Sequence, residues 1–152
     1  MNETVRIDYL ILANHVEAIN GMLYISGGGW TEHYRLIQPD GKPPISHLGV
    51  GISIAIPWNE TNAPHTVEMT IEDDDAREMV LHAKIGLSVG RPPQLPPGAE
   101  QHVVVAIPAD IHFPHDGGYR LNLKLDGDSN TKIWNFNVHD VHQPSIPGSL
   151  PK

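Results

Sequence analysis

Ten histidines among 152 residues are the side chains of this chain best suited to chemistry, because imidazole binds transition metals and exchanges protons near neutral pH. Two local clusters stand out: His112 with His115, and His139 with His142 around Asp140. A zinc site takes three or four protein ligands, so these four histidines are candidate metal ligands only if the fold brings further ones to them. If a strand continued through the second cluster, His139 and His142 would point to opposite faces.

His33, His82 and His102 could supply the missing ligands only through tertiary contacts. The cupin metal pattern, a His-x-His followed by a glutamate and a later histidine, is absent. A metal-binding protein or metal-dependent enzyme is therefore an alternative hypothesis, and we predict no cofactor.

Neither nucleophilic catalysis nor paired-carboxylate catalysis is expected of this chain. No Ser/His/Asp order can be recognised from local signatures, and the chain has no cysteine, which excludes thiol nucleophiles, disulfides and cysteine zinc sites. Acidic residues concentrate in expected turns such as Glu72–Asp75, and not in apolar surroundings that would raise a pKa. We predict no catalytic residue.

Four further side chains are candidate binding residues: Trp30, Tyr34, Trp58 and Arg91. The three aromatic ones could form a platform for a sugar ring, which makes a small-ligand or carbohydrate-binding domain a further alternative. Aromatic side chains at strand ends more often belong to the core, and we interpret Trp58, which follows a proline, as a structural corner. Arg91 lies near the start of a proline-rich segment, residues 90–98. This segment favours an extended crossover between the sheets, and the alternative is that it binds an aromatic groove of a partner.

Alternating apolar and polar residues predict the strands that must position these side chains. The alternation recurs in Val5–Leu12, in a hairpin over Val16–Ile25 with its turn at Asn20–Gly21, and in Leu48–Ile56, Val67–Ile71, Leu81–Val89, Val103–Ile107, Gly117–Leu125 and Ile133–Val138. No window without glycine or proline keeps a helical period. The pattern predicts an all-β, immunoglobulin-like antiparallel β-sandwich of seven to nine strands.

The alternation also predicts which side chains form the core and which strand is central. The expected core residues are Ile7, Tyr9, Val50, Ile52, Ile54, Val67, Met69, Val105, Tyr119, Leu121, Leu123, Trp134 and Phe136. The strand Val5–Leu12 is expected to be central, because its second half is apolar on both faces. Three successive glycines, residues 27–29, indicate a bulge or a close backbone approach.

One face of the Leu48–Ile56 strand carries only glycine, serine and alanine, at positions 49, 51, 53 and 55. These side chains are too small to fill an intersheet gap of about 10 Å, so another element must pack closely on this face. Trp30 and Tyr34 are the nearby side chains expected to cover it. A second subunit is the alternative, which makes a homodimer possible.

Length and charge place further bounds on the class of protein. We expect one domain over residues 1–142, followed by a tail rich in proline, glycine and serine over residues 143–152. The sequence shows neither a signal peptide nor a run of about 20 apolar residues, which predicts a cytoplasmic protein without a membrane partner. The formal net charge is −8, and lysines and arginines are scattered, so nucleic acid is excluded as a partner.

Several segments resemble a family of small uncharacterised bacterial proteins: Asp8–Ala13, Asn20–Tyr24 with the exit Gly27–Trp30, Ile56–Asn62, and Val89–Pro93 with Leu95–Gly98. The resemblance extends from Val5 to about Val138, and the segments with Trp58 and Arg91 are its most distinctive parts. It implies a single β-rich domain and transfers no catalytic residue. Together with the strand pattern, it leads to the hypothesis of a non-catalytic β-sandwich interaction or binding module with an unknown protein partner.

Overall fold

The computed structural model describes residues 4–128 and 130–142, which form β-strands and one short 3₁₀-helix. The elements are β1 (Arg6–Ile19), β2 (Met22–Gly28), β3 (Glu32–Ile37), β4 (Ser46–Ile56), η1 (Trp58–Glu60), β5 (Pro64–Asp73), β6 (Met79–Ser88), β7 (Gln101–Ile111), β8 (Gly117–Leu125) and β9 (Thr131–His142). The predicted all-β class is confirmed. No helix in the described ranges is long and apolar enough to cross a membrane. The predicted tail, residues 143–152, lies outside them.

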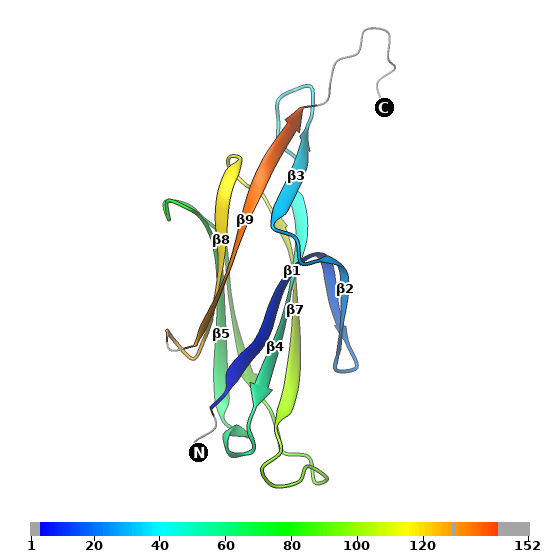
Figure 1. Cartoon of the computed structure of the whole chain (residues 1–152), viewed down its shortest axis with the longest axis vertical. Coiled ribbons are helices and arrows are strands. Elements are labelled where there is room, and N and C mark those ends of the chain that lie inside the picture. Colours follow the sequence, from blue (N-terminus) through cyan, green and yellow to red (C-terminus); the bar gives the residue numbers. More distant parts are fainter. Residues whose placement is uncertain (1–3, 129, 143–152) are drawn as a thin grey trace.

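The strands form two facing sheets (Figure 1). The first sheet has the order β2-β1-β4-β7, and the second has the order β3-β9-β8-β5-β6. The predicted central position of the first strand is confirmed, because β1 lies between β2 and β4. Strand pairs are antiparallel except β3 and β9, which run parallel, so the purely antiparallel prediction is wrong at that edge.

One apolar core lies between the sheets, and β4, β5 and β8 contribute most of it. Most of the predicted core side chains are buried, but Tyr9 is 42% exposed and was predicted wrongly. The register of β1 against β4 shifts between Ile7 and Tyr9, which inverts the alternation and turns Leu10 and Leu12 inward instead. Val105 and Trp134 are only partly buried against this core.

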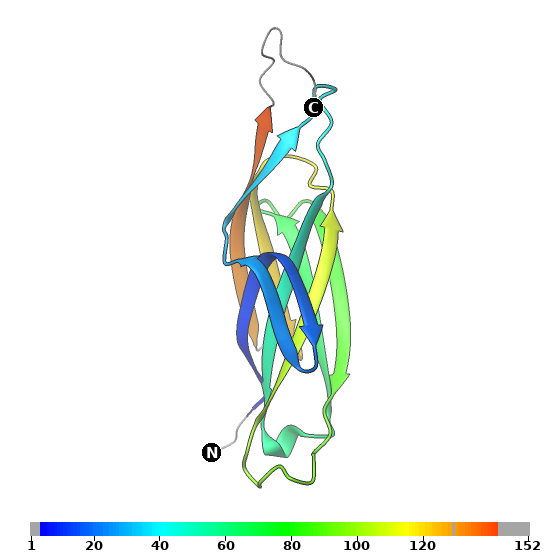
Figure 2. The same cartoon turned by 90° about the vertical axis from the view of Figure 1, so that its right-hand side faces the viewer.

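The first hairpin is confirmed at the residues that predicted it. Asn20 and Gly21 both have positive φ, 51° and 75°, and the strands on either side pair from Ile19 and Met22 outward. Two successive positive φ angles are what a type I′ turn requires. The hairpin does not extend the sheet in its plane: Figure 2 shows it lying across the outer face of the first sheet.

This folded-over hairpin covers the small face of β4 at Gly49 and Gly51. A Cβ on Gly49 would lie 2.7 Å from Val16 Cγ2 and 2.8 Å from the Val16 backbone nitrogen, and one on Gly51 would lie 2.8 Å from Leu23 Cδ2. The close packing predicted for this face is therefore confirmed. The prediction that Trp30 and Tyr34 cover this face is wrong, because residues of the hairpin lie over Gly49 and Gly51 instead.

The parallel edge is held by a buried ion pair. Arg35 on β3 is only 3% exposed, and its Nε donates a hydrogen bond to Asp140 Oδ1 on β9 over 2.5 Å. Its Nη1 donates to the carbonyl oxygen of Phe113 over 2.6 Å. A buried guanidinium is costly unless its donors are satisfied, so these acceptors link β3, β9 and the β7–β8 connection at one end of the molecule.

We predict that Gly49→Ala destabilises the fold by about 1–3 kcal/mol, because the new methyl group would overlap backbone that cannot move aside. Gly86→Ala on β6 is the matched control, since no atom lies within 4 Å of its Cβ position and its φ is not positive. The control should leave the stability unchanged or raise it by up to about 1 kcal/mol. Urea unfolding measures the stability of both variants, and equal stabilities of Gly49→Ala and Gly86→Ala would contradict the close packing of the hairpin on β4.

Candidate functional site

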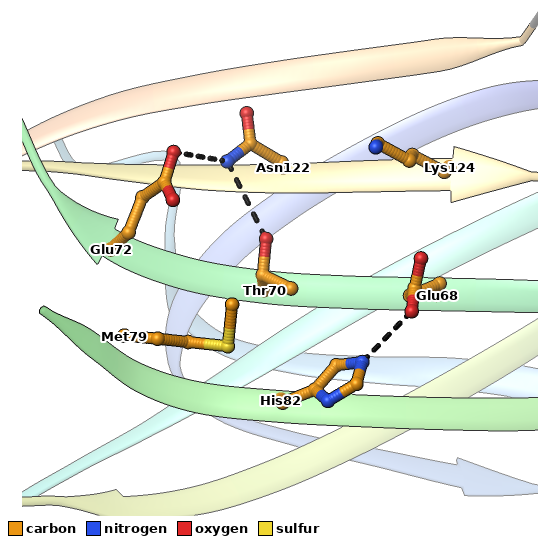
Figure 3. A pocket seen from close by; sticks show the side chains of 7 residues that line it. All are labelled: Glu68, Thr70, Glu72, Met79, His82, Asn122 and Lys124. Carbon is orange, nitrogen blue, oxygen red and sulfur yellow. Dashed lines mark hydrogen bonds and ion pairs between the residues drawn. The ribbon is translucent and has the colours of Figure 1, made fainter. Parts of the chain in front are cut away.

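A polar hollow of about 390 Å³ lies on the outer face of the second sheet (Figure 3). Its walls come from β5, β6 and β8, whose alternate residues face outward: Glu68, Thr70, Glu72, Met79, His82, Asn122 and Lys124. Asn122 Nδ2 donates to Glu72 Oε1 over 3.3 Å. The hollow offers hydrogen-bonding groups to a polar ligand, but its lining includes no Trp, Tyr or Phe on which a sugar ring could stack.

The charged groups of this hollow have protein partners. His82 Nε2 lies 2.9 Å from Glu68 Oε2, and this hydrogen bond is the main reason that the pKa of Glu68 is lowered. Lys124 forms an ion pair with Asp128 over 2.9 Å, which raises the pKa of the lysine. A ligand would have to exchange these contacts for its own.

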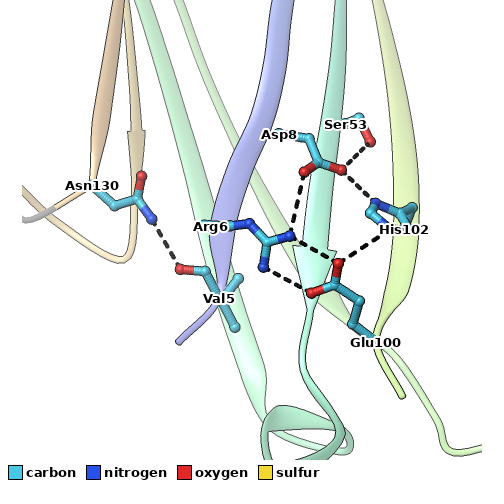
Figure 4. Close-up of polar contacts among 7 residues, drawn as sticks. All are labelled: Val5, Arg6, Asp8, Ser53, Glu100, His102 and Asn130. Atoms are coloured by element: carbon cyan, nitrogen blue, oxygen red, sulfur yellow. Dashed lines mark hydrogen bonds and ion pairs between the residues drawn. The ribbon is translucent and has the colours of Figure 1, made fainter. Parts of the chain in front are cut away.

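A second polar assembly joins β1, β4 and β7 on the outer face of the first sheet (Figure 4). Arg6 donates two hydrogen bonds of 2.8 Å to the carboxylate of Glu100, which lowers the pKa of Glu100. His102 bridges Glu100 and Asp8, and Ser53 Oγ donates to Asp8 over 3.3 Å. Ser53 is only 3% exposed, so its hydroxyl is not accessible to a substrate and this assembly offers no nucleophile.

A third assembly runs in line across the same face. His15 Nδ1 lies 3.1 Å from His47 Nε2, and the outer nitrogens of the two rings contact Glu17 Oε1 over 3.1 Å and Asp110 Oδ1 over 2.7 Å. No local sequence pattern singles out either histidine. Both histidines lie two residues from the pair Ala13 and Gly49, where β1 leaves β4. Their contact therefore depends on the crossing of the two strands, which is a tertiary feature.

One histidine does contact a serine hydroxyl, the arrangement of a base and nucleophile. His33 Nε2 lies 2.9 Å from Ser46 Oγ, and burial together with the nearby Arg35 lowers the pKa of His33, which keeps the ring neutral. Ser46, however, is only 4% exposed. A hydroxyl closed to solvent is closed to a substrate, so we interpret this contact as part of the packing around Arg35.

His65 is buried between two acidic residues at the other end of the sandwich. Its Nδ1 lies 2.6 Å from Asp126 Oδ2, and its Nε2 lies 3.8 Å from Glu60 Oε2. Asp126 also accepts the Thr66 N–H over 2.9 Å. A hollow of about 360 Å³ adjoins this histidine, and the contacts join the start of β5 to the β8–β9 turn and to η1.

The four histidines predicted as metal ligands are not assembled into one site. His112 and His142 are exposed, His115 contacts Asp73 and stacks on Tyr119, and His139 contacts Glu32 over 2.6 Å. Across the ranges 4–128 and 130–142, no three histidine, cysteine or acidic side chains are grouped to hold a metal ion.

The aromatic candidates lie in separate environments. Trp30 stacks on His33 and packs edge-on against Phe136, whereas the exposed Tyr34 stacks on His139. Trp58 shares no partner with either, so the structure assembles no common platform for a sugar.

Trp58 and Arg91, the most distinctive residues of the family resemblance, contact each other. The Arg91 guanidinium lies 3.6 Å above the indole ring, its Nη2 donates to the Trp58 carbonyl oxygen over 2.7 Å, and its Nε donates to Thr61 Oγ1 over 2.9 Å. The Asn62 N–H donates to the Val89 carbonyl oxygen over 2.7 Å. These bonds fasten η1 to the start of the proline-rich loop, as expected of a structural corner.

The β1–β2 hairpin presents apolar side chains to solvent. Ile19, Met22 and Tyr24 are 47%, 53% and 50% exposed, and their register places them on the face opposite Val16 and Leu23. This outward face, Ile19 with Met22 and Tyr24, is called the hairpin face below. Exposed apolar side chains gathered on one projecting element are typical of an interaction surface.

Comparison with protein-family models assigns the chain to a family. A family model described as a family of unknown function, DUF6941, matches residues 8–139. The matched region agrees with the extent of the resemblance and confirms it. No curated protein matches the chain.

Arg91→Lys tests the corner. We expect a loss of about 1–2 kcal/mol in stability, because lysine keeps the charge but cannot stack over the indole while donating to both oxygens. Arg77→Lys, on the exposed β5–β6 turn, is the control and should unfold like the wild type. If both variants unfold at the same urea concentration, the contacts of Arg91 contribute nothing to the free energy of unfolding.

His115→Gln tests the pairing with Asp73. A hydrogen bond to the Asp116 carbonyl oxygen and one to Asp73 raise the pKa of His115, so the protonated ring stabilises the fold. This contribution is complete below the ordinary pKa of about 6.5 and is lost as the pH rises through the higher folded value. Thermal melting should therefore separate wild type from variant more at pH 5.5 than at pH 8.5.

The exposed His112→Gln is the control for that measurement, and its midpoint should follow the wild type at both values. If the difference in melting midpoint between wild type and His115→Gln stayed constant or grew with pH, it would contradict the raised pKa of His115.

Proposed function

We propose that this chain, which belongs to the DUF6941 family of unknown function, is a non-catalytic immunoglobulin-like β-sandwich that binds another protein through its β1–β2 hairpin. The observation that carries the proposal is the exposed hairpin face of Ile19, Met22 and Tyr24. The geometry supports binding better than catalysis, because the histidines contact carboxylates or a buried serine and not an accessible nucleophile.

The strand order supports the immunoglobulin-like part of the proposal. With β5, β8 and β9 taken as the C, F and G strands of that fold, the three are neighbours in one sheet, while β4 and β7 pair in the other as B and E do. Tyr119, at the start of β8, donates its hydroxyl to the carbonyl oxygen of His115 over 2.6 Å. A tyrosine at this position that bonds to backbone upstream is a hallmark of such sandwiches.

The edge of β2 supports protein binding by strand addition. β2 is the terminal strand of its sheet and pairs only with β1, so its other edge presents backbone N–H and C=O groups. An extended segment of a partner can pair with such an edge, and its alternate side chains then contact the exposed Met22 and Tyr24. Edge strands that carry apolar side chains are otherwise a risk for aggregation, which favours a physiological occupant.

Charge determines which occupant fits best. No lysine or arginine occurs between Arg6 and Arg35, and the chain has a formal net charge of −8. A second copy would bring the same negative charge to the interface. The proposed partner is therefore an extended protein segment with apolar and basic side chains, and the homodimer is the competing occupant.

The double substitution Met22→Lys with Tyr24→Lys tests the hairpin face. It should lower capture of the partner from a lysate of the source organism at least tenfold, because it removes apolar contact and repels a basic segment. Ile133→Lys, on the outer face of the second sheet and 57% exposed, is the matched control and should capture as the wild type does. Equal capture by both variants would overturn the proposal.

Light scattering distinguishes the two occupants. A mass near 16.7 kDa for the purified wild type supports a different protein as partner. Twice that mass, lost in the double lysine variant and kept in Ile133→Lys, would replace the proposed partner with a second copy.

A further inference from the structure

A hollow of about 260 Å³ lies on the exposed side of the β1–β2 hairpin, which crosses the first sheet in Figure 2. Its lining comes from both strands: His15 and Glu17 of β1, and Tyr24, Ile25 and Ser26 of β2. The register places His15 opposite Ser26 and Glu17 opposite Tyr24. Because Tyr24 belongs to the hollow and to the hairpin face, a partner bound at the hairpin face reaches this hollow.

The carboxylate of Glu17 gives the hollow its negative charge. Its Oε1 lies 3.1 Å from Nε2 of His15, whereas its Oε2 has no hydrogen-bond or ion-pair partner in the described part of the chain. The side chain is 55% exposed, so a ligand can contact Oε2 without breaking an existing bond. No lysine or arginine occurs between Arg6 and Arg35, so no basic side chain of the hairpin neutralises this charge.

The ring of Tyr24 offers a second kind of contact. It is 50% exposed, and no aromatic or cationic side chain among residues 4–128 and 130–142 packs against it. The electron-rich face of an aromatic ring attracts a cation placed over it, as in the contact of Arg91 with Trp58. A carboxylate and a free aromatic ring in one hollow are therefore suited to a planar guanidinium group.

The spacing of the strands favours a long basic side chain. A partner segment paired with the free edge of β2 would lie about 4.8 Å from β2 and about 10 Å from β1, which carries Glu17. Only arginine and lysine combine a positive charge with enough length to cross Tyr24 toward that carboxylate. Lysine carries a compact ammonium, whereas the arginine fork can stack on the ring and donate to the carboxylate at once.

We propose that this hollow binds an arginine side chain of the extended partner segment, an assignment that rests on the proposed function of the hairpin. The guanidinium lies over the ring of Tyr24 and donates to Glu17 Oε2, and the hydroxyl of Ser26 on the same face is a further acceptor. A side chain two positions from the arginine points to the same side of the segment and contacts Met22. The recognised segment is therefore an arginine with an apolar residue two positions away.

Two peptides test the hollow: acetyl-Val-Thr-Arg-Thr-Val-amide, and the same peptide with citrulline in place of arginine. Citrulline has nearly the shape of arginine but no charge. NMR titration of the full, isotope-labelled chain at low ionic strength, where ion pairs are least screened, measures both affinities. We expect the arginine peptide to bind about fivefold more tightly or better, with shift changes at the backbone amides of residues 15–17 and 22–26.

Glu17→Gln separates this contact from general attraction to an acidic chain. It should lower the affinity for the arginine peptide about two- to fivefold more than that for the citrulline peptide. Glu32→Gln is the matched control, because Glu32 is also half-exposed and bonded to a histidine, but lies on the second sheet. The control removes the same charge and should keep the wild-type preference for arginine.

Tyr24→Leu tests the ring, because it keeps an apolar side chain but removes the aromatic face. It should weaken binding of the arginine peptide about two- to fivefold, the size of a cation–π contact at an exposed site. Circular dichroism of each variant must match the wild type, so that loss of binding is not loss of fold.

Three results would overturn the arginine assignment: equal affinity for the two peptides, equal effects of Glu17→Gln and Glu32→Gln, or no binding of the arginine peptide at millimolar concentration. If both peptides bind the hairpin equally well, protein binding at the hairpin face stands and only the arginine hollow fails. If the arginine peptide binds as expected but the double lysine variant captures its partner like the wild type, the proposed function fails and the hollow remains an arginine site.

Discussion

The close crossing of β1 over β4 is the constraint on which the outer surface of the first sheet depends. β1 can pass over β4 only because Gly49 and Gly51 have no side chain where Val16 and Leu23 arrive. Past this point β1 leaves its partner and pairs with β2 alone, so the hairpin lies on the sheet as a partial third layer. Val16, which faces Gly49, is buried, and Leu23, which faces Gly51, is half-buried, whereas the apolar residues on the opposite side form the hairpin face.

The surface chemistry of the molecule follows from many histidines in an acidic chain. Seven of the ten histidines contact a carboxylate: His15, His47, His65, His82, His102, His115 and His139. Most of these contacts join neighbouring strands or turns, so they orient the rings on the two sheets. Among the described histidines, only His15 and His47 also contact each other through their ring nitrogens.

The two ends of the sandwich are closed by different interactions. At one end Arg35 is buried and bonds to Asp140 and to the backbone of the β7–β8 connection, and at the other end Arg91 stacks over Trp58. The first arginine is costly to bury and therefore specifies one arrangement of β3 against β9. The second lies at the surface, where the same side chain fastens a corner. Both arginines stabilise the fold, and the hairpin remains for binding.

The sequence by itself determined every strand except β3, the Asn20–Gly21 turn and most of the core, because each of these depends on residues close together in the chain. The error at Tyr9 came from a single bulge, which inverts a pattern of period two without leaving a local signal. Sequence reasoning also recognised that β4 needs close cover, but it chose the wrong residues. Contacts such as Gly49 with Val16 and His15 with His47 join positions more than 30 residues apart. Only tertiary structure decides them, because the path of β1 across the sheet depends on the packing of both strands together.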